Sequence, residues 1–419
     1  MAVTAAELRA DLIYNYAGLA VLAASGIVLN FIVVWGWDEE ALGVFNQVIA
    51  VYVVVAMLAS GGLHAATLRA VAAHHDDAEE VANTASASVA LSLASSVPVS
   101  LAFYLSSGII ADLFDSPAVG DGIRIITPGL LCFSINKVLI AIVNGLQHMR
   151  VFALVQGLRG ALVVVCITGC WWQDAPSWQL PIVFTLTEVA LFVLVLGYIS
   201  TQVRLWRVPP ASWLATHIWF CAKNFASGVL LELNGRIDVL MLGVYHSDAL
   251  VGIYSFAALF AEGFFQLIVV LQNIYQPMVA VHAAQDDIEA VDAVVRTGRR
   301  LTYLIMLGTV PLALLLFPVA TSIAGAGLSD SVLPFAILVL GMALAAGVLT
   351  FQNTLAMANL PGWHTIFMIG AVTANVAANA VLIPQFDIIG AAAATACSYL
   401  LAAALLTALT RKLVGARLF

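Results

Sequence analysis

Charged residues are scarce in this chain. Asp, Glu, Lys and Arg make up 10% of its 419 residues, whereas hydrophobic residues make up 62%, and lysine occurs only at positions 137, 223 and 412. A soluble domain carries about 25% charged residues. The scarcity of charge therefore excludes an ordinary soluble protein, and the net charge of -8 argues against any role with nucleic acid.

The sequence also lacks the short motifs of enzymes. It contains no P-loop, no HExxH pattern and no nucleophile elbow, so nothing in it indicates ATP hydrolysis or another catalytic site. All five cysteines lie in apolar stretches, and although Cys166 and Cys170 share a helical face, no His or carboxylate completes a metal set. We therefore expect neither an enzyme nor a cofactor or metal site. Any energy for work must come from an ion gradient or from the gradient of the substrate itself.

Long apolar runs dominate what the sequence does contain. A membrane-spanning helix needs about 17–25 such residues. The first run, Leu12–Val34, is long enough to stay in the membrane and is not the pattern of a cleaved signal. We expect spans at 11–35, 42–63, 84–108, 125–146, 151–171, 180–201, 215–243, 250–281, 301–323, 332–358, 363–383 and 389–410. The predicted fold class is an all-α integral membrane protein with twelve transmembrane helices.

Basic residues outside these spans lie almost entirely on one side of the expected membrane. The other side has only Arg124, and its loops are acidic. Because Lys and Arg favour the cytoplasmic side, both termini are predicted to be cytoplasmic in a multi-pass protein of the plasma membrane. The basic residues on the predicted cytoplasmic side are Arg9, Arg69, Arg150, Arg204, Arg207, Arg296, Arg299, Arg300, Arg411, Lys412 and Arg417.

The sequence contains an internal repeat. Three short motifs of the first half recur in the second half at offsets of 209, 210 and 215 positions, and the pairs are Leu42–Phe45 with Val251–Tyr254, Asp76–Val81 with Asp286–Val291, and Ala141–Asn144 with Ala356–Asn359. Since six spans return the chain to its starting side, the two halves share one orientation and are related by a pseudo-two-fold axis along the membrane normal. We expect an N-terminal six-helix lobe at 1–203, a cytoplasmic linker at 204–212 and a C-terminal six-helix lobe at 213–419.

The second copy of the acidic motif opens a segment with a helical pattern, Asp286–Arg300. Ile288, Val291 and Val295 share one face of it, and charged residues occupy the other. This pattern predicts a helix that lies in the cytoplasmic interface of the membrane. A regulatory or coupling role for the segment is the alternative.

Charged residues inside the spans are the best guide to a substrate site, because each costs about 2.5–3.5 kcal/mol to bury. Lys137 and Arg159 lie in the fourth and fifth spans, and the nearby acid in the sequence is Glu188 in the sixth. Arg holds phosphate with two parallel hydrogen bonds, and Lys holds it as a point charge. Lys137 and Arg159 are therefore predicted to form a cationic face that binds an anionic substrate, phosphate above all.

Other polar residues in the spans extend the candidate site. Glu232 and Arg236 of the seventh span are four residues apart, so they share a helical face and form either an internal salt bridge or part of the site, while Asp238 turns away. Many Asn and Gln residues at membrane depth predict helix-to-helix hydrogen bonds and a hydrated cavity that meets sugar hydroxyls. The candidate substrate-binding residues are Lys137, Arg159, Lys223, Arg236, Asn136, Asn234, Glu188, Glu232 and Asp238.

Several segments, taken together in their order, resemble one family. They are Asn375–Tyr399, Ile237–Gly243 with Val251–Ala257, Leu42–Phe45, Gly61–Leu63 with Arg69, and Ile110–Phe114 with Pro117. Over most of the chain, from about residue 12 to 408, they resemble the polysaccharide and lipid-linked oligosaccharide flippases, the Wzx-type branch of the multidrug/oligosaccharidyl-lipid/polysaccharide (MOP) exporter superfamily. Lys137 and Arg159 match no motif of that family, so their role is argued from charge alone.

The resemblance implies a MATE-like fold of two six-helix lobes around a central cavity. Such a protein flips a lipid-linked oligosaccharide or polysaccharide precursor from the cytoplasmic to the outer leaflet by alternating access. The implied partners are an isoprenoid-phosphate-linked glycan, membrane lipids and, as candidates, glycosyltransferases of the same pathway. The alternatives are a cation-coupled multidrug or metabolite antiporter of the same fold and a membrane scaffold for glycosyltransferases. Glu188 is the one deep acid of the first lobe and the charges expected in the cavity lean positive, which favours an anionic cargo over cation coupling.

Overall fold

Two helical units make up the chain. The computed structural model describes residues 5–205, 207, 213, 228–285, 287–416 and 418. In these ranges every regular element is a helix, and no strand occurs. Contacts within the chain divide it into two compact units, Met1–Glu232 and Leu233–Phe419, each of which buries its own apolar residues.

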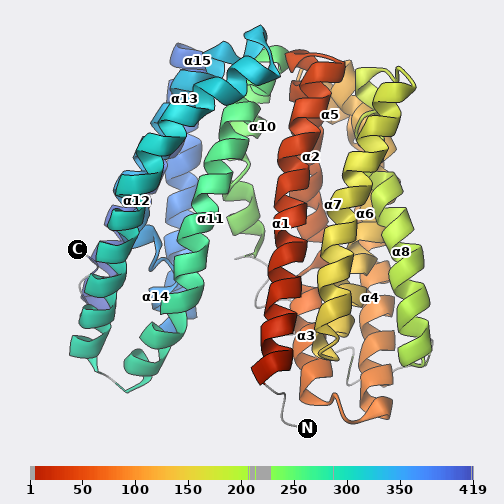
Figure 1. Cartoon of the computed structure of the whole chain (residues 1–419), viewed down its shortest axis with the longest axis vertical. Helices are drawn as coiled ribbons and strands as arrows, with labels where there is room; N and C mark the ends of the chain where they lie inside the picture. The colour runs from red at the N-terminus through yellow and green to blue at the C-terminus, as the bar shows by residue number, and fades with distance from the viewer. Residues whose placement is uncertain are drawn as a thin grey trace. The chain divides into compact units, whose positions relative to one another are not determined.

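The first unit is a bundle of long helices joined by shorter ones (Figure 1). Its helices are α1 (Ala5–Gly36), α2 (Glu39–Ser60), α3 (Leu63–Ala73), α4 (Ala78–Leu105), α5 (Ser107–Leu113), α6 (Pro117–Gly145), α7 (Met149–Trp172) and α8 (Ile182–Gln202), with a 3-10 turn, η1, at Ser177–Gln179. α6 packs against α2, α3, α4, α5, α7 and α8, and it is therefore the central helix of this unit.

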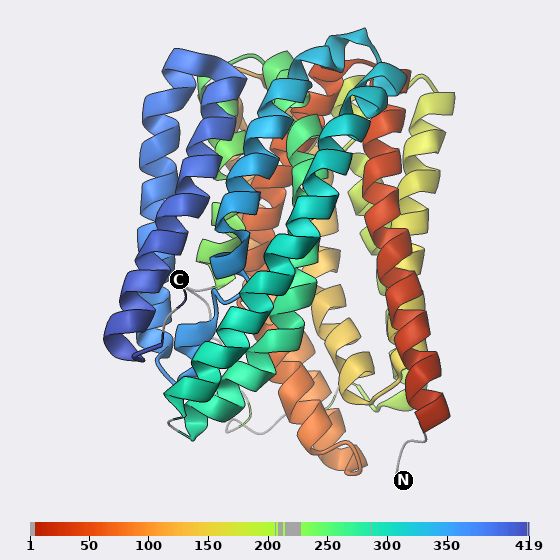
Figure 2. The ribbon, with the colours of Figure 1, turned by 60° about the vertical axis from the view of Figure 1, so that its left-hand side comes forward.

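The second unit contains the longest helices. They are α10 (Ile237–Tyr245), α11 (Asp248–Ala284), α12 (Ile288–Ala324), α13 (Val332–Leu349), α14 (Thr354–Met357) and α15 (Pro361–Leu413), with a 3-10 turn, η2, at Ala326–Ser331. α11 and α12 run side by side and meet at one end (Figures 1 and 2). Each has 37 residues, or about 55 Å at 1.5 Å per residue, so both are longer than the apolar core of a bilayer.

Aspartate caps fix where several helices begin. Asp38 Oδ1 accepts a hydrogen bond from Ala41 N at 2.8 Å at the start of α2. Asp77 and Asp287 accept in the same way from backbone N–H groups at the starts of α4 and α12. Such caps satisfy donors that have no partner inside the helix. The repeated acidic motif of the sequence is thus explained by capping, since Asp77 and Asp287 are its two equivalent residues.

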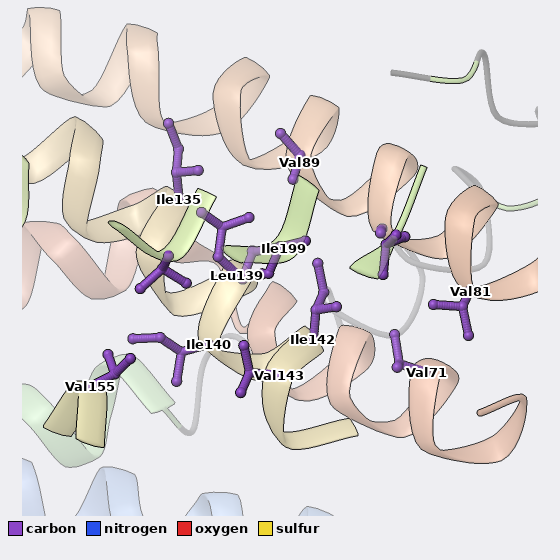
Figure 3. Close-up of a cluster of buried hydrophobic side chains, with 14 of the residues drawn as sticks. Val71, Val81, Val89, Ile135, Leu139, Ile140, Ile142, Val143, Val155 and Ile199 are labelled. Atoms are coloured by element: carbon purple, nitrogen blue, oxygen red, sulfur yellow. The ribbon is translucent and has the colours of Figure 1, made fainter. Parts of the chain in front are cut away.

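Buried aliphatic side chains hold α6 in place. Figure 3 shows Leu139 and Ile142 of α6 in one cluster with Val71 of α3, Val81 of α4 and Ile199 of α8. Leu139 and Ile142 are 0% exposed. Inside a membrane such a cluster gains stability from close packing between helices. Residues of α6 next to the cluster, including those of the candidate site, are consequently presented from a well-packed helix.

The second unit repeats the packing order of the first. α13 packs against α11, α12 and α15, as α6 packs against α2, α4, α7 and α8. Backbone positions with positive φ recur as well, since Gln147 and Asn359 follow α6 and α14, and Asp174 and Asp387 separate the last two helical segments of each unit. These pairs are 212 and 213 positions apart. The internal repeat is therefore visible in backbone geometry as well as in sequence.

One register of the predicted repeat needs correction. His148 N donates to Val143 O at 3.1 Å, and Leu360 N donates to Leu355 O at 2.9 Å, so these helix ends are equivalent at an offset of 212. The offset of 215 predicted from the sequence pairs Asn144 with Asn359 instead. It was wrong by almost one helical turn because residues three apart lie on the same helical face.

Ten helices in the described ranges are long and apolar enough to cross a membrane. α15 accounts for two expected spans, 363–383 and 389–410, because it bends at Asp387, where φ is 50° and ψ is -129°. Residues 215–227 of the seventh expected span, 215–243, lie outside the described residues. Every other expected span overlaps a described helix. The protein is thus all-helical and integral to a membrane, as the sequence predicts.

Small residues allow the two segments of α15 to pack closely. Figure 2 shows these segments as two blue helices joined by a bend. A side chain at Gly390 would overlap the backbone carbonyl of Leu382, and one at Gly341 of α13 would overlap Ala396. Only glycine fits at either position, because small residues let the helices approach closely there.

The segment predicted to be an interfacial helix is instead the start of α12. Asp286 lies outside the described residues, and from Ile288 the helix continues to Ala324. Val291 and Val295 are 0% and 1% exposed, so their apolar face packs inside the second unit. The sequence pattern could not separate the two cases, because an apolar stripe has the same period whether it faces lipid or protein.

Candidate functional site

Four of the predicted site residues meet in the first unit. Asn136 and Lys137 come from α6, Arg159 from α7 and Glu188 from α8. Arg159 Nε lies 2.9 Å from Glu188 Oε1, and Arg159 Nη2 donates to Glu188 Oε2 at 3.3 Å. The side chain of Glu188 is 2% exposed and that of Arg159 is 17% exposed. The acid of the first lobe is therefore the ion-pair partner of one of its two deep cations.

Asn136 fixes the position of Glu188. Its Nδ2 donates to the Glu188 carboxylate at 2.8 Å and to the backbone carbonyl of the same residue at 2.9 Å. Asn136 is 0% exposed, so both bonds are formed away from solvent and lipid. A hydrogen bond to a charged group contributes about 1.5–3 kcal/mol. α6 and α8 are thus joined at this point, independently of Arg159.

Lys137 and Arg159 lie beside the same aromatic ring. Lys137 Nζ is 5.0 Å and Arg159 Cζ is 5.6 Å from the centroid of Phe133. Lys137 Nζ also lies 3.4 Å from Met57 Sδ, and it forms no ion pair with any carboxylate of the described residues. Both cations are half-buried. The ring and the sulfur atom stabilise them at membrane depth while leaving N–H donors for a ligand.

The aromatic and sulfur neighbours are not among the predicted site residues. Phe133 precedes Lys137 by four positions, so helical spacing was a signal that could have found it. Met57 and Tyr52 lie on α2, and no local pattern connects them with the cations. Tyr52 packs on Phe133 with ring centroids 5.8 Å apart. Its buried hydroxyl has no hydrogen-bond partner among the described residues.

The candidate residues of the second unit lie around a broken helix. The chain leaves the helical conformation after Asn234, and α10 begins three residues later. Asn375 Nδ2 of α15 donates to both the backbone and the side-chain oxygen of Asn234 at 3.2 Å. Asn379 Nδ2 in turn donates to Asn375 Oδ1 at 2.8 Å. A broken helix at membrane depth needs such partners for its freed carbonyls, so these asparagines have a structural role.

The helix break separates Glu232 from Arg236. The prediction that they share a helical face and neutralise each other is wrong, because the two residues are not in one continuous helix. Arg236 Nη2 lies instead 3.6 Å from Glu262 Oε1 of α11. The side chains of Arg236 and Glu262 are 29% and 52% exposed. Lys223, another predicted site residue, lies outside the described residues.

Asp238 is the buried acid of the second unit. It is 8% exposed, and its Oδ2 accepts from the hydroxyl of Tyr254 and from Thr395 Oγ1 at 3.4 Å. Its Oδ1 accepts from Val239 N at 2.9 Å. All three donors are neutral, and within the described ranges no cation forms an ion pair with Asp238. Such an acid can take up a proton or attract a small cation.

The described residues contain two separate polar groups, one in each unit. The first unit brings Asn136, Lys137, Arg159 and Glu188 together, and this group can bind an oxyanion through its cations. The second unit holds Asn234, Arg236 and Asp238 near α10, each with its own partners. No set of three or more His, Cys, Asp or Glu side chains that could hold a metal ion occurs in the described part of the chain.

The chain matches the model of one protein family, and its fold is similar to those of solved membrane transporters. The model of a family described as polysaccharide biosynthesis protein matches residues 38–336. The fold is similar to a multidrug-resistance MATE-family transporter of the MOP superfamily in its inward-facing conformation (TM-score 0.83, 15% identity, 94% of each chain covered). It is also similar to the lipid II flippase MurJ in an inward closed conformation (TM-score 0.77, 12% identity, 96% of this chain and 87% of that chain covered).

A third similar structure is a MOP superfamily transporter from Pyrococcus furiosus that has a binding pocket of reverse polarity (TM-score 0.63, 14% identity, 96% of this chain and 94% of that chain covered). No protein of curated function matches the chain in sequence. At these identities the structural likeness shows the fold alone. The MATE-like fold predicted from the sequence is confirmed.

Proposed function

The chain belongs to the polysaccharide biosynthesis protein family, and from this premise we propose that it moves a lipid-linked oligosaccharide or polysaccharide precursor across the plasma membrane. The cargo is an isoprenoid-phosphate-linked glycan, and it moves from the cytoplasmic to the outer leaflet by alternating access. Both termini are cytoplasmic. The protein is a transporter without catalytic residues, and glycosyltransferases of the same pathway build its cargo.

The cations of the first unit are the observation that carries this proposal. Lys137 and Arg159 are half-buried in membrane-spanning helices beside the ring of Phe133. Burying two cations in a span is costly unless an anion repays the cost. Glu188 neutralises one of them, which leaves a net positive charge for phosphate.

The other predicted residues take more limited roles in the proposal. Asn136 holds Glu188 through its Nδ2 atom and is 0% exposed, so it positions the site and does not touch the cargo. Asn234 is bound by Asn375 and stabilises the broken helix. Arg236 pairs with Glu262, and Arg236, Glu232 and Lys223 remain predicted substrate-binding residues.

A cation-coupled multidrug or metabolite antiporter is the second candidate function. Asp238 favours it, because this buried acid has only neutral hydrogen-bond donors. The likeness to a MATE-family multidrug transporter is compatible with it. The two candidates differ in their cargo, an anionic lipid-linked glycan or a drug-like molecule.

Deletion of the gene followed by lipid extraction tests the proposal. For a flippase we expect lipid-linked glycan to accumulate on the cytoplasmic leaflet and to disappear when the wild-type chain is restored. Unchanged glycan lipids together with increased sensitivity to toxic compounds would contradict the proposal and favour the antiporter. Lys137→Ala is the informative variant for complementation, because in the part of the chain that the structure describes Lys137 forms no ion pair whose acid its loss would leave buried.

A further inference from the structure

The side chains of the Arg159–Glu188 ion pair differ in how firmly other residues hold them. Glu188 is anchored by Asn136 through both its carboxylate and its backbone carbonyl, and its side chain is 2% exposed. Arg159 bonds to the same carboxylate and, more weakly, to Gln156 Oε1 at 3.5 Å, and its side chain is 17% exposed. The arginine is therefore the member that can change its partner.

Arg159 also has the geometry to bind a second anion. A guanidinium group carries five N–H donors in a planar fork that fits carboxylate and phosphate equally well. Lys137, beside the same ring of Phe133, adds a positive charge next to it. A phosphate that reaches these two cations competes with Glu188 for the guanidinium group.

The charges decide what happens to Glu188 in that competition. When Arg159 turns to a phosphate, Glu188 remains buried, with Asn136 as its donor and a second anion close by. A buried carboxylate without a cation is strongly unfavourable, and protonation removes the charge. A protonated carboxyl group still accepts the hydrogen bond from Asn136, so the fold around it does not have to change.

No other described group that faces Glu188 takes that proton in its place. At neutral pH the Lys and Arg side chains are already protonated, and so are the phenol and thiol groups. None of them can therefore accept a further proton. The titratable groups that face Glu188 are Arg159 on α7, Lys137 and Cys132 on α6, and Tyr52 on α2.

We propose that Glu188 is a proton-binding counter-ion, an inference that rests on the proposed transport of a phosphate-linked lipid. Arg159 exchanges the Glu188 carboxylate for the substrate phosphate, and Glu188 takes up one proton from water as this happens. When the phosphate leaves, the proton leaves and the ion pair forms again. Anion binding and proton binding therefore strengthen each other, so a lower pH tightens the binding of the anion.

Calorimetry on the purified full-length chain in detergent tests this exchange. Farnesyl diphosphate is the probe, and each titration is repeated in two buffers of different ionisation enthalpy to count protons. We expect the wild-type chain to take up about one proton more per bound diphosphate than Glu188→Gln. We also expect Glu188→Gln to bind the probe about tenfold more tightly, because no carboxylate competes for Arg159.

Asp121→Asn is the matched control. It also removes a carboxylate from an arginine of the same unit, Arg124 at 2.9 Å, but this pair is about half exposed. Its proton uptake and affinity should equal those of the wild-type chain. Inorganic diphosphate in parallel separates recognition of the phosphates from binding of the isoprenoid tail.

The outcomes separate this inference from the proposed function. Equal proton uptake by the wild-type chain and Glu188→Gln overturns the inference and leaves the diphosphate site standing. No binding of farnesyl diphosphate to the wild-type chain overturns both. If Glu188→Gln does not fold, infrared difference spectra of the wild-type chain decide the matter. A protonated carboxylic acid that appears when the probe is added supports the exchange, and its absence contradicts it.

Discussion

Arg159 and Lys137 carry the same charge but differ as residues on which to test transport. Arg159 balances a glutamate whose side chain is 2% exposed, whereas Lys137 contacts a sulfur atom and an aromatic ring. Removing one partner of a buried ion pair leaves the other charge unpaired. Loss of export in Arg159→Ala would therefore mix a binding defect with a folding defect, which charge counting in the sequence could not show.

The Arg159–Glu188 pair predicts a double-mutant effect on stability. Arg159→Ala should lower the free energy of unfolding by about 3–5 kcal/mol, because it leaves the Glu188 carboxylate buried without a cation. Arg159→Ala with Glu188→Gln should lose clearly less, since no unpaired charge remains. Thermal unfolding in detergent, followed by tryptophan fluorescence, measures both. Strictly additive losses would show that the two side chains do not stabilise each other.

Lys137 predicts a loss of export at little cost in stability. Lys137→Ala should reduce glycan export strongly, because the phosphate loses a point charge, while its unfolding transition stays close to that of the wild-type chain. Lys137→Arg keeps the charge and should retain most export. Surface glycan in cells that lack the wild-type gene gives the readout. Normal export by Lys137→Ala would show that the cationic group of Lys137 and Arg159 is not needed for transport.

At the scale of elements, the sequence predicts helices well and their interruptions poorly. The apolar spans are found because length and hydropathy alone decide them, and Asp38 and Asp77 begin helices as ordinary caps. The break after Asn234 is not found, because its freed carbonyl is satisfied by Asn375 from a distant helix. Partners from distant elements decide such breaks, and so the pairing of Arg236 with Glu262 is also missed.

The bend of α15 gives a prediction for this element. Gly390→Ala should destabilise the protein by about 1–3 kcal/mol, because the added Cβ meets backbone atoms of Leu382 and Ile383, which cannot move as a side chain can. Gly362→Ala is the control in the same helix, since nothing lies within 4 Å of its Cβ position. It should be neutral or slightly stabilising. Thermal unfolding of the two variants compares them, and equal stability would contradict the close approach.

At the scale of the whole molecule, the internal repeat predicts the architecture and the distribution of basic residues predicts the topology. The sequence finds the repeat because short motifs recur, and the helix ends just before Gln147 and Asn359 refine its register. The MATE-like fold also follows from the sequence through family resemblance. The ion-pair geometry does not, because Asn136, Arg159 and Glu188 meet only after three helices have packed.

The distribution of basic residues predicts the topology of the molecule. A fluorescent protein fused to the C-terminus should fold and fluoresce, because that end is predicted to be cytoplasmic, whereas an alkaline phosphatase fusion at the same point should be inactive. Fusions after Trp37, between the first two spans, should give the reverse pattern. The opposite result at both points would invert the predicted orientation of the chain.

Flipping by the purified protein in vesicles tests the central claim most directly. The wild-type chain and Lys137→Ala are reconstituted with a fluorescent isoprenoid-diphosphate-linked glycan, and a membrane-impermeant quencher reports how much of it is exposed outside. We expect the wild-type chain to make nearly all of the probe accessible, and Lys137→Ala to leave the inner half protected for much longer. Probe that stays protected with the wild-type chain, as in protein-free vesicles, would contradict the account.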